Sequence, residues 1–106
     1  MLENSEVLLR AIFSAIARQT FPPRDLLGIV RSGRAGDKQV RAFNMCDGTK
    51  SQGEIAKALK VDAGNFSRTV ARWIEAGILV RLGEGRDAKL LHAYPVALDK
   101  KGKVRE

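Results

Sequence analysis

The side chains best suited to a chemical task lie between Asp62 and Ala76. Asn65, Arg68 and Arg72 recur there at spacings of three and four residues, so on a helix they share one face. An arginine can donate two hydrogen bonds to O6 and N7 of guanine, and an asparagine can pair in the same way with N6 and N7 of adenine. We therefore predict that Arg68 and Asn65 contact base edges of double-stranded DNA, with Arg72 one turn further along.

A second group of basic side chains is expected to contact phosphates, which fix the register of a protein on a duplex without reading its sequence. These residues are Lys50, Lys57, Lys60 and Arg86. The chain of 106 residues carries 19 basic and 12 acidic side chains, and its net charge of +7 favours a polyanionic partner. Charge alone does not distinguish nucleic acid from an acidic membrane surface, and each of these side chains can also simply be solvated.

No pattern in the sequence indicates an enzyme, a metal site or a cofactor. His92 and Cys46 are the single histidine and the single cysteine, which falls short of the three or four protein ligands of a zinc site. Cys46, beside Met45 on an expected helix, is more typical of a buried structural residue, and a redox-sensing thiol is the alternative. Trp73 fits core packing better than a base-stacking platform.

The helix that carries the polar face is predicted from its apolar spacing and its ends. Asp62 can serve as the N-cap, and Gly77 stands where a C-terminal glycine cap belongs. The residues expected to face the core recur at helical spacing: Phe66, Val70, Trp73 and Ile74. The sequence therefore predicts a recognition helix over about residues 62–76.

A second helix is expected before this helix in the chain, and a β-hairpin after it. Ser51 and Glu54 form a capping box, which begins the preceding helix and leaves only a short turn between the two. Two β-compatible runs, residues 78–82 and 89–94, enclose a polar turn that contains glycine. They predict a β-hairpin, or wing, over residues 78–94.

Three further helices are predicted in the first half of the chain. Apolar spacing indicates a helix over residues 3–20, Pro23 can begin a second helix that ends at Val30, and a third is expected over residues 37–46. We therefore predict a mainly α-helical fold with a small β-hairpin, a winged helix-turn-helix preceded by an N-terminal helical hairpin. Its parts are the N-terminal helices over residues 1–36, the winged helix-turn-helix domain over 37–96, and a basic flexible tail over 97–106.

The stretch from Ser51 to Val80 has a small residue where the two helices cross, apolar residues around the turn, an N-cap residue, and a closing segment at the end of the second helix. The residues concerned are Ala56, Leu59, Val61, Asp62 and residues 75–79. In these features the stretch, about a third of the chain, resembles the helix-turn-helix of MarR-like winged-helix regulators. In such proteins the second helix lies in the major groove, and the hairpin contacts the flanking backbone or the minor groove.

The resemblance also implies which side chains lie at the DNA. Residues 87–89 are similar to the Asp-x-Arg wing signature of the family, with lysine in place of the arginine. The residues that the resemblance places at the groove or the wing are Asn65, Ser67, Arg68, Arg72, Arg86 and Lys89.

A homodimer is expected, because one recognition helix and one wing read few base pairs. Two copies on half-sites about one helical turn apart normally supply the missing specificity. The N-terminal helix has an apolar face that we expect to form the dimer seam, and packing within the same chain is the alternative. This face consists of Val7, Leu8, Ile12, Phe13 and Ile16.

The sequence as a whole predicts a cytoplasmic, sequence-specific protein that binds double-stranded DNA and regulates transcription. Arg10 and Arg18 interrupt the longest apolar stretch near the N-terminus, so neither a signal peptide nor a membrane span is expected. The alternative function is that of a winged-helix module that binds other proteins within a larger complex.

Overall fold

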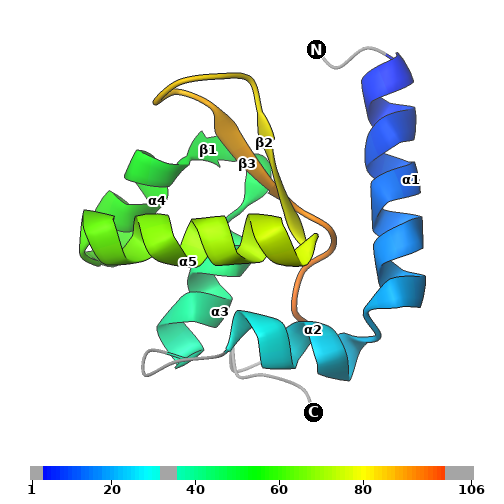
Figure 1. The fold of residues 1–106 in the computed structure, drawn as a ribbon, viewed down its shortest axis with the longest axis horizontal. Coiled ribbons are helices and arrows are strands. Elements are labelled where there is room, and N and C mark those ends of the chain that lie inside the picture. The colour runs from blue at the N-terminus through cyan, green and yellow to red at the C-terminus, as the bar shows by residue number, and fades with distance from the viewer. Residues whose placement is uncertain (1–3, 32–35, 100–106) are drawn as a thin grey trace.

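The computed structural model describes residues 4–31 and 36–99, which form five helices and a three-stranded antiparallel sheet (Figure 1). The elements follow the order α1 (Asn4–Thr20), α2 (Pro23–Val30), α3 (Gly36–Asn44), β1 (Asp47–Ser51), α4 (Gln52–Leu59), α5 (Ala63–Ala76), β2 (Leu79–Leu82) and β3 (Lys89–His92). Helix, short turn, helix and hairpin follow one another as in a winged helix-turn-helix. The predicted mainly α-helical, winged helix-turn-helix fold is confirmed.

Helices α4 and α5 begin at the predicted caps. Ser51 Oγ accepts a hydrogen bond from Glu54 N at 3.3 Å, and Glu54 Oε1 accepts one from Ser51 N at 3.0 Å. At the start of α5, Asp62 Oδ2 accepts from Asn65 N at 2.8 Å. Lys60, in the left-handed region at φ 55°, ends α4. Because each helix end is fixed by such local bonds, the turn between the two helices is short and defined.

The core is built around the buried face of α5. Trp73 and Phe43 are fully buried, and their rings meet edge to face with centroids 5.2 Å apart. Phe66 packs against Trp73 in the same manner at 6.2 Å. The predicted inward positions Phe66, Val70 and Trp73 are all buried, as expected, and Ile74 is partly buried against them. This packing fixes the rotation of α5 and leaves its opposite face in solvent.

Strand β3 is the middle strand of the sheet, in the order β1-β3-β2. The β2–β3 hairpin confirms the two predicted wing strands. β1 was not predicted: the expected helix over residues 37–46 is followed by Asp47 and Gly48, residue types that are typical of a helix end and not of a strand. It becomes a strand by pairing with β3, Asp47 opposite Leu91 and Ser51 opposite Lys89, with an irregularity between the two pairs. Gly48, at φ 90°, has the backbone freedom that such a bulge needs.

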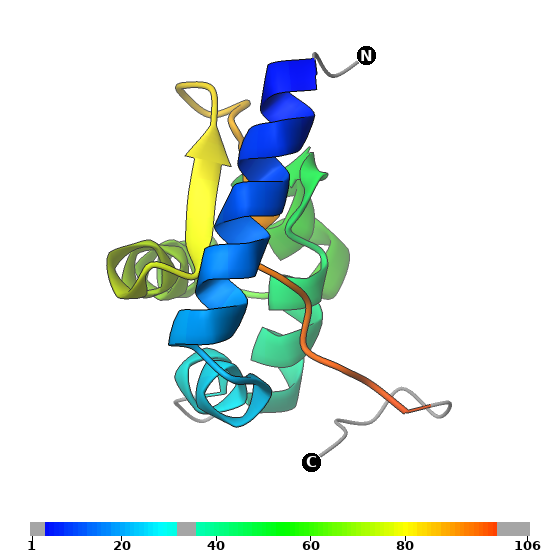
Figure 2. The ribbon, with the colours of Figure 1, turned by 90° about the vertical axis from the view of Figure 1, so that its right-hand side faces the viewer.

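The two N-terminal helices do not form the predicted helical hairpin. α2 turns away from α1 instead of folding back along it (Figures 1 and 2). Pro22 between them is extended, at φ −56° and ψ 159°, which directs the chain away from α1. The buried Leu26 and Val30 of α2 pack against the body of the domain, where α2 contacts α3 and α5. Burial against the domain therefore decides the path of α2.

Helix α1 stands on one side of the sheet (Figure 2). Its C-terminal end is held by Tyr94, whose hydroxyl donates to the backbone oxygen of Phe21. The guanidinium of Arg18 lies 4.4 Å from the centre of the Tyr94 ring, a cation–π contact. Ala17 of the same turn is buried in the core. The attachment of α1 to the domain is thus concentrated near its last turn.

The chain after β3 returns to α3. Val96 N donates to Asn44 Oδ1 at 2.8 Å, Asn44 Nδ2 donates to Val96 O at 3.0 Å, and Leu98 packs against the core. The predicted basic tail over residues 97–106 therefore starts with a packed segment. Its residues 100–106, which carry all of its basic side chains, lie outside the described residues.

Candidate nucleic-acid interface

The outward face of α5 carries the side chains predicted to read base edges. All are exposed: Asn65, Ser67, Arg68 and Arg72. Arg68 donates a hydrogen bond to Asn65 Oδ1, so two of the predicted readers are in direct contact with each other. Thr69 Oγ1 donates to the backbone oxygen of Asn65 at 3.2 Å. These exposed polar side chains, on the first three turns of α5, are of the kind that can contact base edges in a groove of DNA.

The lysines predicted to lie at DNA, three through phosphate contacts and Lys89 through the wing resemblance, fall into two kinds. Lys50 Nζ lies 3.4 Å from Asp47 Oδ2, and Lys89 Nζ lies 3.3 Å from Glu54 Oε1. The other two are exposed on α4 and at its C-terminal end: Lys57 and Lys60. Exposed ion pairs are weak and screened by salt, so Lys50 and Lys89 can exchange a carboxylate for a phosphate at little cost.

The two carboxylates in these pairs are held in the ionised form. Hydrogen bonds from Thr49 lower the pKa of Asp47 below its ordinary value. The backbone hydrogen bond from Ser51 lowers the pKa of Glu54, with Lys89 contributing in the same direction. Both groups are therefore negative at neutral pH, and they offset part of the positive charge near the start of α4.

The wing presents Arg86 beyond its tight turn. Gly83 and Gly85 take φ values of 96° and 77°, a region that disfavours side chains with a Cβ. Arg86, next in the loop, is exposed. Figure 1 shows this loop extending toward the side of the molecule that carries α4 and the start of α5. The wing and the recognition helix therefore face the same side.

Arg81, on the wing strand β2, was not among the residues predicted to lie at DNA. Its side chain is exposed, and its Nη2 donates to Gln52 Oε1 at 3.1 Å, which ties the wing to the first turn of α4. The signal was available, because Arg81 alternates with the apolar Val80 and Leu82, and alternate strand residues point to opposite faces. Arg81 adds a positive charge to the interface at the junction of wing and helix.

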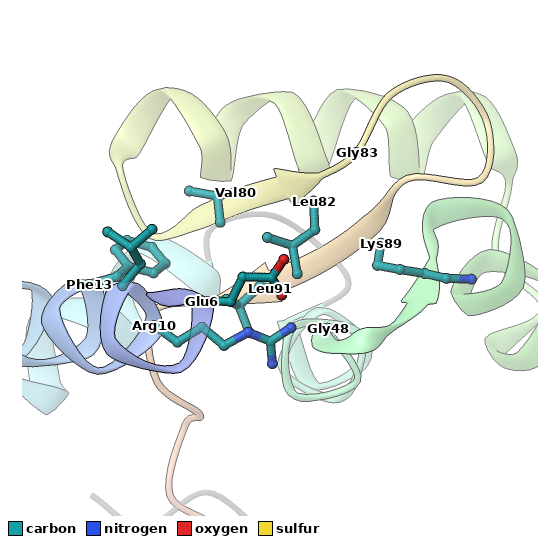
Figure 3. Close-up of a pocket in the computed structure, with 10 residues that line it drawn as sticks. Glu6, Arg10, Phe13, Gly48, Val80, Leu82, Gly83, Lys89 and Leu91 are labelled. Atoms are coloured by element: carbon teal, nitrogen blue, oxygen red, sulfur yellow. The ribbon is translucent and has the colours of Figure 1, made fainter. Parts of the chain in front are cut away.

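A groove of about 640 Å³ separates the first part of α1 from the sheet (Figure 3). Arg10 of α1 reaches toward Gly48 of β1, and a Cβ built on Gly48 would lie 2.8 Å from Arg10 Nη2. The apolar lining consists of Leu9, Phe13, Val80, Leu82 and Leu91. Phe13, predicted as part of the dimer seam, instead lines this groove and packs against the core.

Cys46 and His92 lie next to one another in the fold, where Cys46 is buried and His92 is partly buried. The Cys46 thiol is fully buried and donates to Ala42 O at 3.3 Å, and His92 N donates to Cys46 O at 2.7 Å. Burial, followed by the nearby Asp47 carboxylate, raises the pKa of Cys46 to about 12. Burial also lowers the pKa of His92, whose ring stacks on Phe43. Cys46 is thus the buried structural residue that was predicted, and its protonated thiol is poorly suited to redox sensing.

Residues 4–31 and 36–99 contain no group of three or more histidine, cysteine, aspartate or glutamate side chains placed to hold a metal ion. None of the helices in these ranges combines the length and the apolar character needed to cross a membrane.

The model of the MarR family matches residues 39–90 of the chain. The match begins inside α3 and ends inside β3, so it includes α4, α5 and the wing turn. Comparisons with curated proteins and with solved structures gave no match. The matched region contains every residue predicted to lie at DNA, and α1 and α2 lie outside it.

Proposed function

We propose, from the premise that residues 39–90 form a MarR-like winged helix domain, that this chain binds double-stranded DNA with sequence specificity and regulates transcription. Domains of this family are winged-helix, DNA-binding transcriptional regulators in general. The observation that carries the proposal is the division of α5 into a buried apolar face and an exposed face with Asn65, Arg68 and Arg72.

The proposed docking follows from dimensions and charge. The major groove of B-DNA is about 12 Å wide and admits an α-helix. With α5 in the groove, its exposed side chains meet base edges, and Lys57 and Lys60 lie on the neighbouring helix and turn, where phosphates run along the groove. The wing, with Arg86 at its turn and Arg81 on strand β2, contacts the adjacent backbone or minor groove.

The proposal is tested by the salt dependence of binding to random-sequence duplex DNA, followed by fluorescence anisotropy. We expect log K to fall linearly with log salt concentration, with a slope of roughly −0.9 for each phosphate contact. Lys57→Ala should reduce the slope by about one contact. Arg24→Ala, which removes an exposed charge from α2, serves as the matched control and should leave the slope unchanged. Absence of binding, or binding without salt dependence, contradicts the proposal and favours a protein partner.

The same proposal includes a homodimer formed through α1. This helix carries a row of apolar side chains that nothing in the described part of the chain covers: Leu8, Ile12 and Ile16 are 61%, 45% and 59% exposed. Val7 and Leu9 beside the row are also exposed. The row recurs every four residues, so it forms one continuous stripe, separate from the turn that anchors α1 near Tyr94. A stripe of this kind suits pairing of two copies of α1.

Replacing Ile12 with glutamate is expected to convert the dimer into a monomer, because a charge at the centre of the stripe must then be desolvated. Sedimentation velocity measures the change, and the DNA affinity for a palindromic duplex should fall with it. Ala97→Glu places the same charge at an exposed position outside α1 and should leave the dimer intact. A wild-type chain that sediments as a monomer while it saturates DNA contradicts this part of the proposal.

A further inference from the structure

Asn65 and Arg68 are joined by a hydrogen bond on the DNA-facing side of α5. Arg68 Nη2 donates to Asn65 Oδ1, and the two residues stand one turn apart, where side chains of a helix meet. The backbone of Asn65 is fixed on both sides, because its N–H donates to Asp62 Oδ2 at 2.8 Å and its carbonyl accepts from Thr69 Oγ1 at 3.2 Å. The pair therefore stands on a part of α5 that is itself well anchored.

This bond changes what the two side chains can offer to a base. An asparagine side chain has one acceptor oxygen and an amide group with two donors, and an arginine has five donors and no acceptor. Arg68 occupies one of the two lone pairs of Oδ1, so the groups that the pair offers outward are mainly donors: the two N–H groups of the Asn65 amide and the remaining N–H groups of the guanidinium. An adenine edge in the major groove requires one donor and one acceptor from the protein, whereas a guanine edge, with O6 and N7, requires two donors.

We propose that Asn65 and Arg68 act as one unit that reads guanine, in which Asn65 is a positioning residue for Arg68 and not an independent reader of adenine. This inference rests on the proposed function and specifies the base class at one contact. Arg68 uses one donor on Asn65 and keeps four, which is enough for O6 and N7 of guanine. Adenine N6 and cytosine N4 are hydrogen-bond donors, so each would face the donors of the pair without an acceptor. Adenine and cytosine are therefore rejected at this position.

Positioning the guanidinium before DNA binds also reduces the conformational entropy that is lost on binding. A free arginine side chain samples many rotamers, and fixing it in a complex costs conformational entropy. The bond to Asn65 restricts Arg68 before DNA arrives. Removing the Asn65 side chain should therefore weaken the guanine contact even though the arginine is still present.

The test begins with a site selected from a random duplex pool by the wild-type chain. Affinities are then measured for duplexes that carry each of the four bases at every position of the site. For Arg68→Ala we expect the preference for guanine at one base pair to fall by roughly 5- to 150-fold, which is the discrimination of a lost bidentate contact expressed as an affinity ratio. Asn65→Ala should lose preference for guanine at that same base pair, by about tenfold, within the same range.

Two further variants separate positioning from direct reading. Asn65→Asp keeps an acceptor for Arg68, so it should retain the guanine preference at that base pair while its overall affinity falls. The double variant Asn65→Ala/Arg68→Ala should lose no more preference than Arg68→Ala alone, because the two residues act through one contact. Both side chains are exposed, so each variant should fold like the wild type. Thermal melting checks this.

The inference is overturned if Asn65→Ala relaxes an adenine preference at a different base pair. It is also overturned if the double variant loses the sum of the preferences that Asn65→Ala and Arg68→Ala lose singly. It is also overturned if Asn65→Asp loses the guanine preference as completely as Asn65→Ala. Failure of the wild-type chain to enrich any duplex is a different result, which rejects the proposed function itself.

Discussion

Replacing Trp73 with alanine should lower the free energy of unfolding by about 3–5 kcal/mol, the usual cost of removing a large buried aromatic side chain. Trp73 is fully buried and contacts the rings of Phe43 and Phe66, so its loss opens a cavity between α5 and α3. Domains of this size are stable by about 5–15 kcal/mol, so the change removes a large part of the total. Urea denaturation followed by far-ultraviolet circular dichroism measures it, because the variant has no tryptophan left for fluorescence.

Trp73→Phe is the matched control for this prediction. Phenylalanine keeps an aromatic ring against Phe43 and Phe66, so it should lose clearly less stability than alanine. DNA binding should follow the folded fraction in both variants, since the outward face of α5 is unchanged. If Trp73→Ala unfolds at nearly the same urea concentration as the wild type, Trp73 does not pack against Phe43 and Phe66 at the centre of the core.

Replacing Arg68 with alanine should weaken binding to a selected DNA site by about 1–3 kcal/mol, the value of a good bidentate contact with a base. Arg68 is exposed and lies in the second turn of α5, so its removal leaves the fold intact. Affinity for random-sequence duplex should change far less, because most non-specific binding comes from phosphate contacts. The ratio of specific to non-specific affinity, measured by competition at one salt concentration, is therefore the quantity that should fall.

Arg24→Ala separates the effect of position from the effect of net charge. Arg24 is also exposed, but it lies on α2, outside the matched winged helix region. Its removal should leave the affinity ratio unchanged. Equal losses in the two variants indicate that only overall charge matters, and the proposed docking of α5 is then wrong.

The parts of the fold set by local interactions were predictable from the sequence. The capping box at Ser51 and the N-cap at Asp62 involve residues three positions apart, so their bonds are encoded by short motifs. The inward positions Phe66 and Trp73 follow from helical periodicity, which also leaves the polar face outward. The location of the candidate site on α5 follows from these features together.

The parts set by distant contacts were not predictable in the same way. β1 has glycine and aspartate at its start and forms only because its backbone pairs with β3, which lies about forty residues further along the chain. Phe13 belongs to the apolar pattern of α1, but only the position of the sheet decides that it turns inward. The bond between Asn65 and Arg68 depends on side-chain rotamers, which residue spacing permits but does not specify.

The most direct measurement is a titration of the isotope-labelled chain with a selected duplex, followed by nuclear magnetic resonance of the backbone amides. If α5 and the wing dock on DNA, the largest shifts should fall in the first two turns of α5 and in the loop around Gly85 and Arg86. Amides on the solvent side of α2 should be unchanged. Large shifts confined to α1 and α2, with the amides of α5 unmoved at saturation, would contradict the proposed interface.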